Sequence, residues 1–312
     1  MATTRNDAPP GPQVWAFGSG KGGVGKSVIA ANTAVALARR GARVVLVDAD
    51  LGGANLHTLL GMANPARTLS DFITRKVDAL DDVLAPTPTE GLRLISGSRA
   101  LMEMANPKYA QKEKILRHVL ALDVDHVLLD LGAGSAFNVI DFFLAAHHGI
   151  VVVVPEPTSV ENTYHFVKAA FYRKLKRAEP RERVREVLGR IVGDRAGHPV
   201  RSPRELIETA AATDPDVGAA LRAQAASFAP GILVNQALTP EQHRLADDIS
   251  IACRDYFGNS VSAFGAIATD PLVNRSVLAR RPAVEMFPQA AFSEAVEALA
   301  ARLSTPVEAV RA

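Results

Sequence analysis

The sequence GSGKGGVGKS at residues 18–27 contains the P-loop pattern G-x-x-x-x-G-K-[ST]. Its fixed positions are Gly20, Gly25, Lys26 and Ser27. Glycines allow the backbone to turn tightly and to direct successive N–H groups at phosphate oxygens. The lysine of such a loop reaches the β- and γ-phosphates, and its Ser or Thr hydroxyl binds Mg²⁺. The stretch therefore predicts a site for ATP and Mg²⁺.

The residues on either side of this loop have the local structure that a P-loop requires. VWAFG at residues 14–18 is a short apolar run, typical of a buried strand. Residues 27–40 are rich in alanine and end at Gly41, which predicts a helix. A helix that begins at the loop adds the positive end of its dipole to phosphate binding. A glycine-rich turn that matched the pattern by chance would not need this context.

Composition limits the remaining possibilities. The chain has 312 residues, of which 48% are hydrophobic, so it can bury a sizeable core as one large α/β domain or two small ones. No apolar run approaches the ~18–20 residues that span a bilayer. The single cysteine, Cys253, excludes a disulfide framework and any cluster held by several cysteines of one chain. We therefore expect a cytoplasmic protein without an iron–sulfur cluster.

A second lysine, Lys21, directly follows the first glycine of the pattern. KGGVGKS at residues 21–27 resembles the signature of the deviant Walker A ATPases, the MinD/ParA family. The resemblance implies that Lys21 reaches the nucleotide bound by the opposite subunit of an ATP-dependent homodimer; the alternative is a solvated loop cation. The residues expected to bind nucleotide in this loop are Gly20, Lys21, Gly22, Gly23, Val24, Gly25, Lys26, Ser27 and Val28.

Two acids follow the next expected strand, at residues 43–47. Asp48 and Asp50 lie at its carboxyl end, where ligands bind in open α/β sheets. Carboxylates there can hold Mg²⁺ through water or orient an attacking water, although an N-cap or a solvated turn is the alternative. Residues 48–61 resemble switch I of the MinD/ParA family, especially its FlhG branch, the regulators of flagellar number and placement. By that resemblance Asp50 positions the hydrolytic water and Asp48 supports the metal.

A third acid, Asp130, ends the apolar run in HVLLDLGAGS at residues 126–135. The pattern fits a Walker B strand that continues into switch II, and FlhG-like proteins have a similar D-x-G-A-G. Asp130 would then bind Mg²⁺ through water, while Gly132 and Gly134 would let the backbone sense the γ-phosphate. A simple turn residue is the alternative for Asp130.

Three later stretches also resemble the family. PEPTS at residues 155–159 places Glu156 and Thr158 at a strand's carboxyl end, facing the nucleotide or the dimer seam, unless they only cap a helix. Asn235 ends the strand at residues 231–236 and resembles the position whose amide pairs with the adenine edge. Pro271 falls in a stretch that resembles the loop over the base and ribose, with a capped amphipathic helix as the alternative.

Residues 172–230 depart from the family. This extra segment is far longer than an ordinary connection. Its first part, residues 172–204, holds eleven Lys and Arg against four Asp and Glu, a net charge of about +7. Its second part, residues 202–228, has helix signals that begin with a Ser cap and a proline. The segment is either a basic helical insertion that meets DNA, anionic membrane or an acidic partner, or a solvated helical surface.

Together these features predict an α/β fold, a doubly wound and mostly parallel sheet of the MinD-like (SIMIBI) P-loop NTPase type. We expect a disordered leader at residues 1–12, one ATPase domain at residues 13–304 with a helical insertion at about 172–230, and a flexible tail at 305–312. The residues expected to act in hydrolysis are Lys21, Lys26 and Asp50, and those expected at Mg²⁺ are Ser27, Asp48 and Asp130.

The resemblance implies a slow Mg²⁺-dependent ATPase that works as a dimerising nucleotide switch. Such a protein positions a cellular apparatus, either polar motility or secretion machinery or the division site, and responds to an activating or cargo protein. It would be cytoplasmic, with a peripheral or polar placement left open. The alternative is a ParA-like DNA-binding segregation ATPase that uses the basic insertion. An iron–sulfur carrier of the Mrp type would need paired cysteines, which this sequence lacks.

Overall fold

The computed structural model describes residues 11–50, 53, 55–97, 109–178, 180–193, 202–258 and 261–305. The expected leader and tail therefore lie almost entirely outside the described residues.

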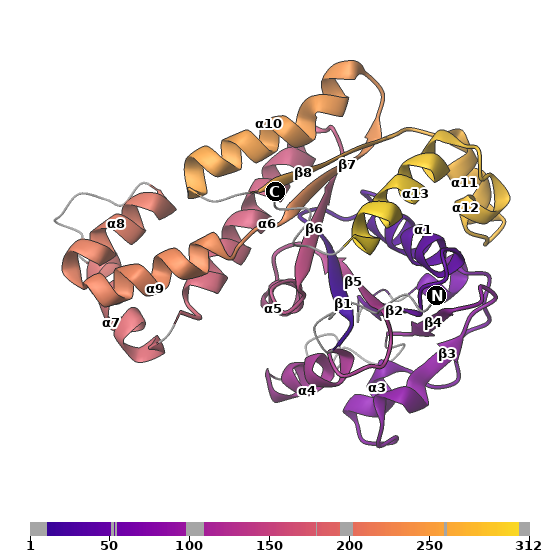
Figure 1. Cartoon of the computed structure of the whole chain (residues 1–312), viewed down its shortest axis with the longest axis horizontal. Helices are drawn as coiled ribbons and strands as arrows, with labels where there is room; N and C mark the ends of the chain where they lie inside the picture. The colour runs from indigo at the N-terminus through magenta and orange to yellow at the C-terminus, as the bar shows by residue number, and fades with distance from the viewer. Residues whose placement is uncertain are drawn as a thin grey trace, which may run out of the picture.

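Eight strands form one sheet in the order β3-β4-β2-β5-β1-β6-β7-β8 (Figure 1). The strands are β1 (Gln13–Ser19), β2 (Val44–Ala49), β3 (Leu84–Pro86), β4 (Leu92–Ile95), β5 (His126–Ala133), β6 (His148–Val153), β7 (Gly231–Ala237) and β8 (Ser262–Ala268). Neighbouring strands run parallel except β3 and β4, which pair antiparallel. The predicted fold class, a mostly parallel α/β sheet, is confirmed.

The central strands are apolar on both faces because both faces are covered by helices. Val45 and Val47 of β2 are buried in one core. Val44 and Leu46 of the same strand are buried in the other. This alternation places a separate hydrophobic core on each side of the sheet and explains why β2 and β6 read as continuous apolar runs.

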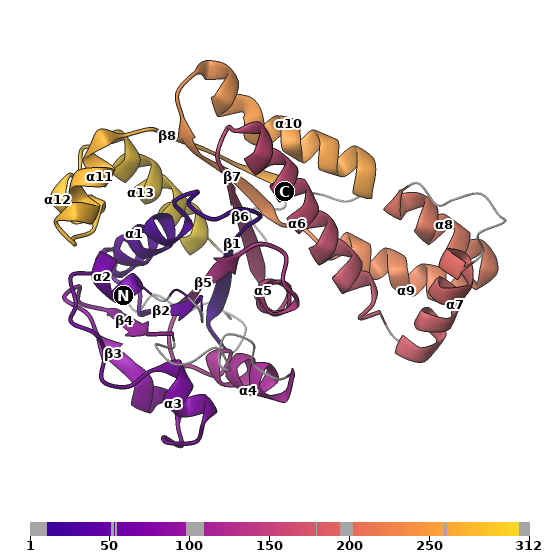
Figure 2. The same ribbon diagram turned by 180° about the vertical axis from the view of Figure 1, so that it is seen from behind.

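Helices cover the two faces as a doubly wound sheet requires (Figures 1 and 2). One core includes residues of α1 (Lys26–Arg39), α2 (Leu56–Leu59), α11 (Pro271–Leu278), α12 (Ala283–Met286) and α13 (Ala291–Ser304). The other includes residues of α3 (Leu69–Ile73), α4 (Tyr109–Val119), α5 (Phe137–Phe143), α6 (Pro157–Leu175) and α10 (Pro240–Phe257), with the 3₁₀ helix η1 (Leu80–Val83) beside them. None of the helices in the described ranges is long and apolar enough to cross a lipid bilayer.

The extra segment forms α7 (Arg181–Gly193), α8 (Pro203–Thr213) and α9 (Pro215–Ala226). These helices lie together at the end of α6, on the side of the molecule away from α1 and α13 (Figures 1 and 2). The expected Ser cap is present, because the Ser202 hydroxyl accepts a hydrogen bond from the N–H of Glu205. The helical stretch is divided at Asp214, whose carboxylate caps α9, and the proline that follows cannot continue α8.

Candidate nucleotide-binding site

The P-loop lies at the carboxyl end of β1, between β5 and β6, and leads into α1. Gly25 is the residue before α1 and has a φ of 84°, which glycine adopts without strain. A Cβ at Gly25 would also lie 2.4 Å from the amide nitrogen of Asn235. A Cβ at Gly20 would lie 2.1 Å from the backbone oxygen of Asn162 in α6. Gly20 is therefore required for the close approach of the loop to α6, a packing role that the phosphate pattern does not reveal.

Lys26 and Asp130 form a buried ion pair below the loop. Lys26 is 7% exposed and Asp130 is 1% exposed. Burial raises the pKa of Asp130 above its ordinary value, while the Lys26 ammonium and a hydrogen bond from Ser27 act in the opposite direction. The pair places the P-loop lysine, its neighbouring hydroxyl and the expected Walker B acid at one point. Phosphate binding by Lys26 must replace or share this contact.

Asp48 lies beside Asp130, because β2 and β5 pair in the register that sets these two residues opposite each other. One of its oxygens, Oδ2, accepts hydrogen bonds from the backbone N–H groups of Asn55 and Leu56, at 2.9 and 3.1 Å. Burial, and then the nearby charge of Asp130, raises the pKa of Asp48 to about 7. Asp48 therefore holds the start of α2 in the expected switch I segment.

These residues fit a Mg²⁺ ion on the chemistry of their donors. The Oδ1 atom of Asp48 is buried and has no hydrogen-bond partner within the described part of the chain. A buried acceptor without a partner is costly, and a metal-bound water would satisfy it. Ser27, Asp48 and Asp130 offer only oxygen atoms, the ligands that Mg²⁺ prefers. No three acids, histidines or cysteines form a closed metal cage among the described residues, and Mg²⁺ does not need one because it keeps water and substrate phosphates as ligands.

Asp50 lies where the two expected switch segments meet. A Cβ added to Gly53 would be 3.2 Å from its carboxylate, and one added to Gly132 would be 3.5 Å from it. Gly53 belongs to the stretch that resembles switch I, and Gly132 to the stretch that resembles switch II. Asp50 thus lies close to both segments, just after the end of β2 and near the strand that carries Asp130.

Lys21 is bound by its own chain. Its Nζ donates to the Glu156 carboxylate at 2.8 Å and to the Thr158 hydroxyl at 3.3 Å, both at the start of α6. Glu156 occupies the N-cap position of α6 but makes no side-chain cap, and the Ser159 hydroxyl instead accepts from the N–H of Val154. The Lys21 and Glu156 side chains are 41% and 57% exposed, so this pair is weak and easily exchanged.

Of the two residues expected to contact the base, Asn235 lies beside the P-loop and Pro271 makes no hydrogen bond to it in the described part of the chain. The Asn235 side chain is buried, and its amide donates to the backbone oxygen of Val24 at 2.8 Å, so it supports the P-loop directly. Gln236, the next residue, has a φ of 60°, a strained conformation of the kind found at binding sites. Pro271 is exposed at the first turn of α11, which the Asp270 carboxylate caps. In the described ranges no hydrogen bond links Pro271 to the P-loop, and its contact with a base stays a prediction, as does adenine pairing by Asn235.

The structure contains one buried polar cluster that the sequence did not predict. Asp141 in α5 is buried and accepts two hydrogen bonds from the guanidinium of Arg173, at 2.9 and 3.1 Å. Arg177 donates to it at 2.6 Å. The available signal was a single acid inside the apolar run FNVIDFFLAA, since a buried carboxylate needs a partner. The cluster joins α5, which follows switch II, to the end of α6.

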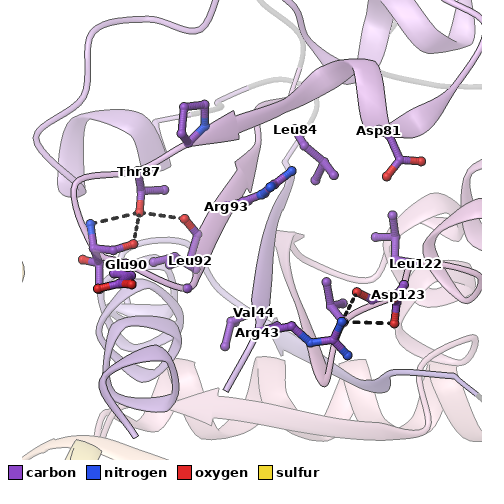
Figure 3. A pocket seen from close by; sticks show the side chains of 14 residues that line it. Arg43, Val44, Asp81, Leu84, Thr87, Glu90, Leu92, Arg93, Leu122 and Asp123 are labelled. Carbon is purple, nitrogen blue, oxygen red and sulfur yellow. Dashed lines mark hydrogen bonds and ion pairs between the residues drawn. The ribbon is translucent and has the colours of Figure 1, made fainter. Parts of the chain in front are cut away.

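A surface cleft of about 480 Å³ lies at the opposite end of the strands from the P-loop (Figure 3). It is lined by residues at the amino ends of β2 and β4, including Arg43 and Arg93. The Arg43 guanidinium donates to Asp123 at 3.1 Å and to Asp125 at 3.0 Å. Nucleotides bind at the carboxyl ends of parallel strands, so we do not assign the nucleotide to this cleft.

Comparisons with known proteins identify the family of the chain. The sequence model of the ParA family, described as NUBPL iron-transfer P-loop NTPase, matches residues 12–177. The antiactivator FleN of Pseudomonas aeruginosa is 38% identical over 159 residues, covering 50% of this chain and 55% of FleN. The flagellum site-determining protein YlxH of Helicobacter pylori is 30% identical over 162 residues, covering 49% of this chain and 52% of YlxH. The chain spans about half the length of these curated relatives.

A solved structure confirms the fold over almost the whole chain. The septum site-determining protein MinD of Pyrococcus horikoshii, complexed with Mg-ADP, superposes with a TM-score of 0.65. The alignment covers 96% of this chain and 99% of that one, at 22% identity. The family match spans more than half of the present sequence and includes the P-loop and both expected switch segments. The protein therefore belongs to the ParA/MinD family of P-loop NTPases.

Proposed function

We propose that the protein is an Mg²⁺-dependent ATPase that dimerises with ATP and acts as a switch in positioning a cellular apparatus. The observation that supports this proposal is that the expected site residues meet at the carboxyl ends of the parallel strands. The P-loop, the buried Lys26–Asp130 pair and Asp48 lie there together, and both expected switch segments reach Asp50. This arrangement couples phosphate binding to the two segments that must change conformation.

Each part of the site has a defined task in this proposal. The backbone of residues 20–27 and the start of α1 bind the phosphates, and Lys26 exchanges Asp130 for phosphate oxygens. Mg²⁺, held by Ser27, Asp48 and Asp130, would neutralise charge on the phosphates. Asp50 orients the attacking water, and phosphate release relaxes both switch segments through their contact with it.

Dimerisation needs Lys21 to change partners. In the proposed dimer, Lys21 leaves Glu156 and Thr158 of its own chain and reaches the phosphates in the other subunit. An exposed ion pair contributes about 0–1 kcal/mol, so its loss costs little compared with what a phosphate contact supplies. Glu156 and Thr158 therefore hold the lysine near the seam without preventing its transfer.

The biological role is proposed from the relatives. FleN is named as an antiactivator, and YlxH and MinD are named as site-determining proteins for the flagellum and the septum. We propose a similar placing role, carried out with an activating or cargo protein at a peripheral or polar position. These relatives do not favour the alternative of a ParA-like DNA-segregation ATPase. Most described cations of the basic segment are also paired with acids of the same chain, which lowers the net positive charge that a DNA backbone would meet.

Phosphate release by purified protein tests the enzymatic part. We expect slow ATP hydrolysis that stops when Mg²⁺ is removed with EDTA. Asp50→Ala should abolish hydrolysis while binding of a fluorescent ATP analogue stays within about threefold of wild type, because Asp50 acts on water and not on the nucleotide. Equal loss of ATP binding and hydrolysis in this variant would refute the role given to Asp50. Unchanged hydrolysis would refute it as well.

A further inference from the structure

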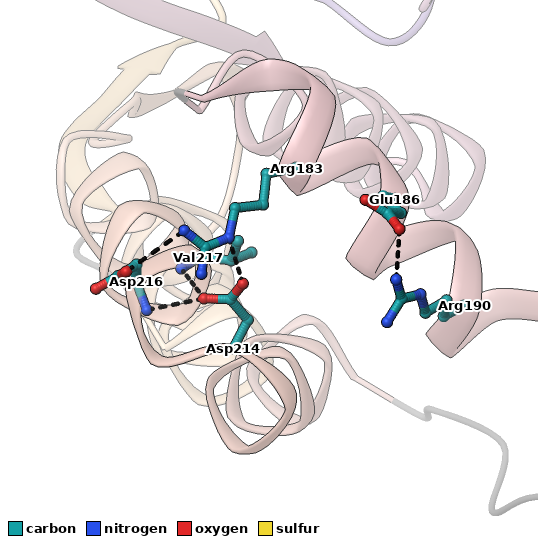
Figure 4. Close-up of polar contacts among 6 residues, drawn as sticks. All are labelled: Arg183, Glu186, Arg190, Asp214, Asp216 and Val217. Atoms are coloured by element: carbon teal, nitrogen blue, oxygen red, sulfur yellow. Dashed lines mark hydrogen bonds and ion pairs between the residues drawn. The ribbon is translucent and has the colours of Figure 1, made fainter.

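The charge of the helical insertion is distributed unevenly once the ion pairs are counted. Figure 4 shows the Arg183 guanidinium of α7 bonded to Asp214 and Asp216 at the start of α9, at 2.5 and 3.5 Å. On the outer side of α7, Arg190 pairs with Glu186 (Figure 4). Arg173 and Arg177, at the end of α6, are bound to Asp141 as described above. These ion pairs neutralise part of the positive charge of the insertion.

Two exposed cations of the same region lie at one cleft. The side chains of Lys176, just after α6, and Arg185, on α7, are exposed, and in the described ranges neither takes part in a hydrogen bond or ion pair. Both line a cleft of about 450 Å³ between the end of α6 and α7, together with Arg173. The apolar side chains of Val184 and Leu188 form its remaining side-chain wall. The cleft therefore combines a cationic rim with an apolar wall.

Gly189 adds an independent observation. It lies inside α7 and lines the cleft, and a Cβ placed on it would meet no atom within 4 Å. Its φ is not in the left-handed region, so neither the backbone nor the packing of the fold requires glycine there. Glycine in a helix interior costs roughly 0.5–1 kcal/mol relative to alanine. The missing side chain leaves the cleft open at the expense of helix stability.

The chemistry of the walls indicates the kind of occupant. A DNA backbone is bound by cations spread along a surface and makes no use of an apolar wall. An amphipathic membrane contact needs a broad face of exposed bulky apolar side chains, and the lining of this cleft offers only the half-buried Leu188 beside the buried Val184. A short helix with acids beside apolar residues matches both the rim and the wall. We propose that this cleft, formed by Arg173, Lys176, Val184, Arg185, Leu188 and Gly189, is the docking site for an acidic amphipathic segment of a partner protein.

The position of Arg173 links this cleft to the nucleotide site. Arg173 lines the cleft and holds Asp141 in α5, and its guanidinium lies 5.3 Å from the ring centroid of Phe137, which is 74% exposed. The helix α5 begins three residues after Gly134 of the expected switch II. A partner carboxylate in the cleft competes with Asp141 for Arg173, and so changes the anchoring of α5. Docking and nucleotide binding are then coupled, in both directions.

A peptide selection tests the docking site directly. The full chain is immobilised and a random 16-residue library on phage is selected against it. We expect enriched sequences to combine Asp or Glu with apolar residues at helical spacing. The most enriched peptide, labelled for fluorescence anisotropy, should bind at least tenfold more weakly to Arg185→Glu and to Gly189→Leu. It should bind Arg190→Glu, a matched charge reversal on the other side of α7, within twofold of wild type.

The controls separate folding from docking. Leucine is a better helix former than glycine, so Gly189→Leu should keep or raise the thermal stability while it fills the cleft. The proposal fails if no acidic amphipathic peptide is enriched, or if the peptide binds Arg185→Glu and Gly189→Leu as it binds wild type. It also fails if a 30-base-pair DNA duplex or phosphatidylglycerol vesicles show the Arg185 dependence instead.

The coupling has its own test and rests on the proposed nucleotide site. Saturating peptide should change the affinity for a fluorescent ATP analogue by at least threefold. An unchanged nucleotide affinity would overturn the coupling while leaving the docking site in place. Peptide binding does not depend on ATP hydrolysis, so failure of the proposed ATPase would be distinguishable from failure of the docking site.

Discussion

The nucleotide-binding end of the sheet and the helical insertion both use ion pairs, but the Lys26–Asp130 pair of the first is buried and the Arg190–Glu186 pair of the second is exposed. The side chains of Lys26 and Asp130 are 8% and 2% exposed, whereas those of Arg190 and Glu186 are 65% and 62% exposed. A buried charge needs a partner, so Lys26 can leave Asp130 only when another anion takes its place. An exposed pair can open at little cost. We therefore expect the buried pair to open only for phosphate, and the exposed pair to exchange partners in water.

The largest expected effect comes from breaking the buried pair. Lys26→Met should lower the free energy of unfolding by about 3 kcal/mol, because it leaves the Asp130 carboxylate buried and unpaired. Arg190→Ala in the insertion should change it by less than about 0.5 kcal/mol. Urea denaturation of the nucleotide-free proteins measures both values.

A second substitution tests whether the loss of stability comes from the unpaired charge of Asp130 or from changed packing at Lys26. The double variant Lys26→Met with Asp130→Asn should recover most of the loss, because no charge is then left without a partner. If the two single variants Lys26→Met and Arg190→Ala were destabilised equally, the contrast between the regions would be wrong.

The Asp141 cluster joins the two regions, and removing its charge comes next in size. Asp141→Asn should destabilise the protein by about 2 kcal/mol, because the amide nitrogen that replaces Oδ2 cannot accept from Arg173, and both guanidinium groups lose their counter-charge. Hydrogen exchange should increase in α5 and also in α7, which follows the end of α6. Increased exchange in α5 alone would show that the cluster does not join the insertion to the switch region.

Substitution of one glycine in each region should have opposite effects on stability. Gly25→Ala should destabilise the P-loop by about 1–2 kcal/mol and reduce the affinity for nucleotide more than tenfold, since alanine is strained at a φ of 84° and its Cβ would collide with Asn235. Gly189→Ala in the insertion should raise stability by about 0.5–1 kcal/mol. Thermal unfolding measures the stability of both variants, and titration with a fluorescent ATP analogue measures their nucleotide affinity. A stability change of the same sign in Gly25→Ala and Gly189→Ala would contradict this prediction.

The smallest effect is expected at Lys21. Glu156→Gln removes the charge that holds Lys21 in its own chain, so the ATP-dependent dimer should form at about two- to fivefold lower protein concentration. Because the pair is exposed, the difference should fade at high salt. Glu161→Gln, on the exposed side of α6, is the matched control and should have no effect. A weaker dimer in Glu156→Gln would mean that Glu156 assists the crossing of Lys21 instead of delaying it.

The parts of the site that lie in contiguous stretches could be predicted from sequence. Lys26 and Ser27 follow a fixed spacing, and Asp48 and Asp130 each end an apolar strand, so parallel pairing alone brings the two acids together. The contacts that depend on distant segments could not be predicted. Asn235 reaches the backbone of Val24 across 211 residues, because β7 is two strands from β1 in the sheet.

The basic segment shows a different limit of sequence reasoning. Its net charge of about +7 left DNA, lipid, an acidic partner and a solvated surface open. The charge count could not tell which cations are already bonded to acids from other helices. Arg183 pairs with Asp214, which lies more than thirty residues later in the sequence, and Arg173 pairs with Asp141, which lies about thirty residues earlier. The charge that remains exposed at Lys176 and Arg185 becomes visible only when the helices are packed.

The most direct test of the central claim is the mass of the protein in solution, measured by size-exclusion chromatography with light scattering. Asp50→Ala protein, which should bind ATP without hydrolysing it, is examined with ATP and Mg²⁺, with ADP, and without nucleotide. We predict a dimer with ATP and Mg²⁺ alone, and a monomer in every condition when Lys21→Ala is added. A monomer in all three conditions before that addition, or a dimer that persists without Lys21, would contradict the proposed switch.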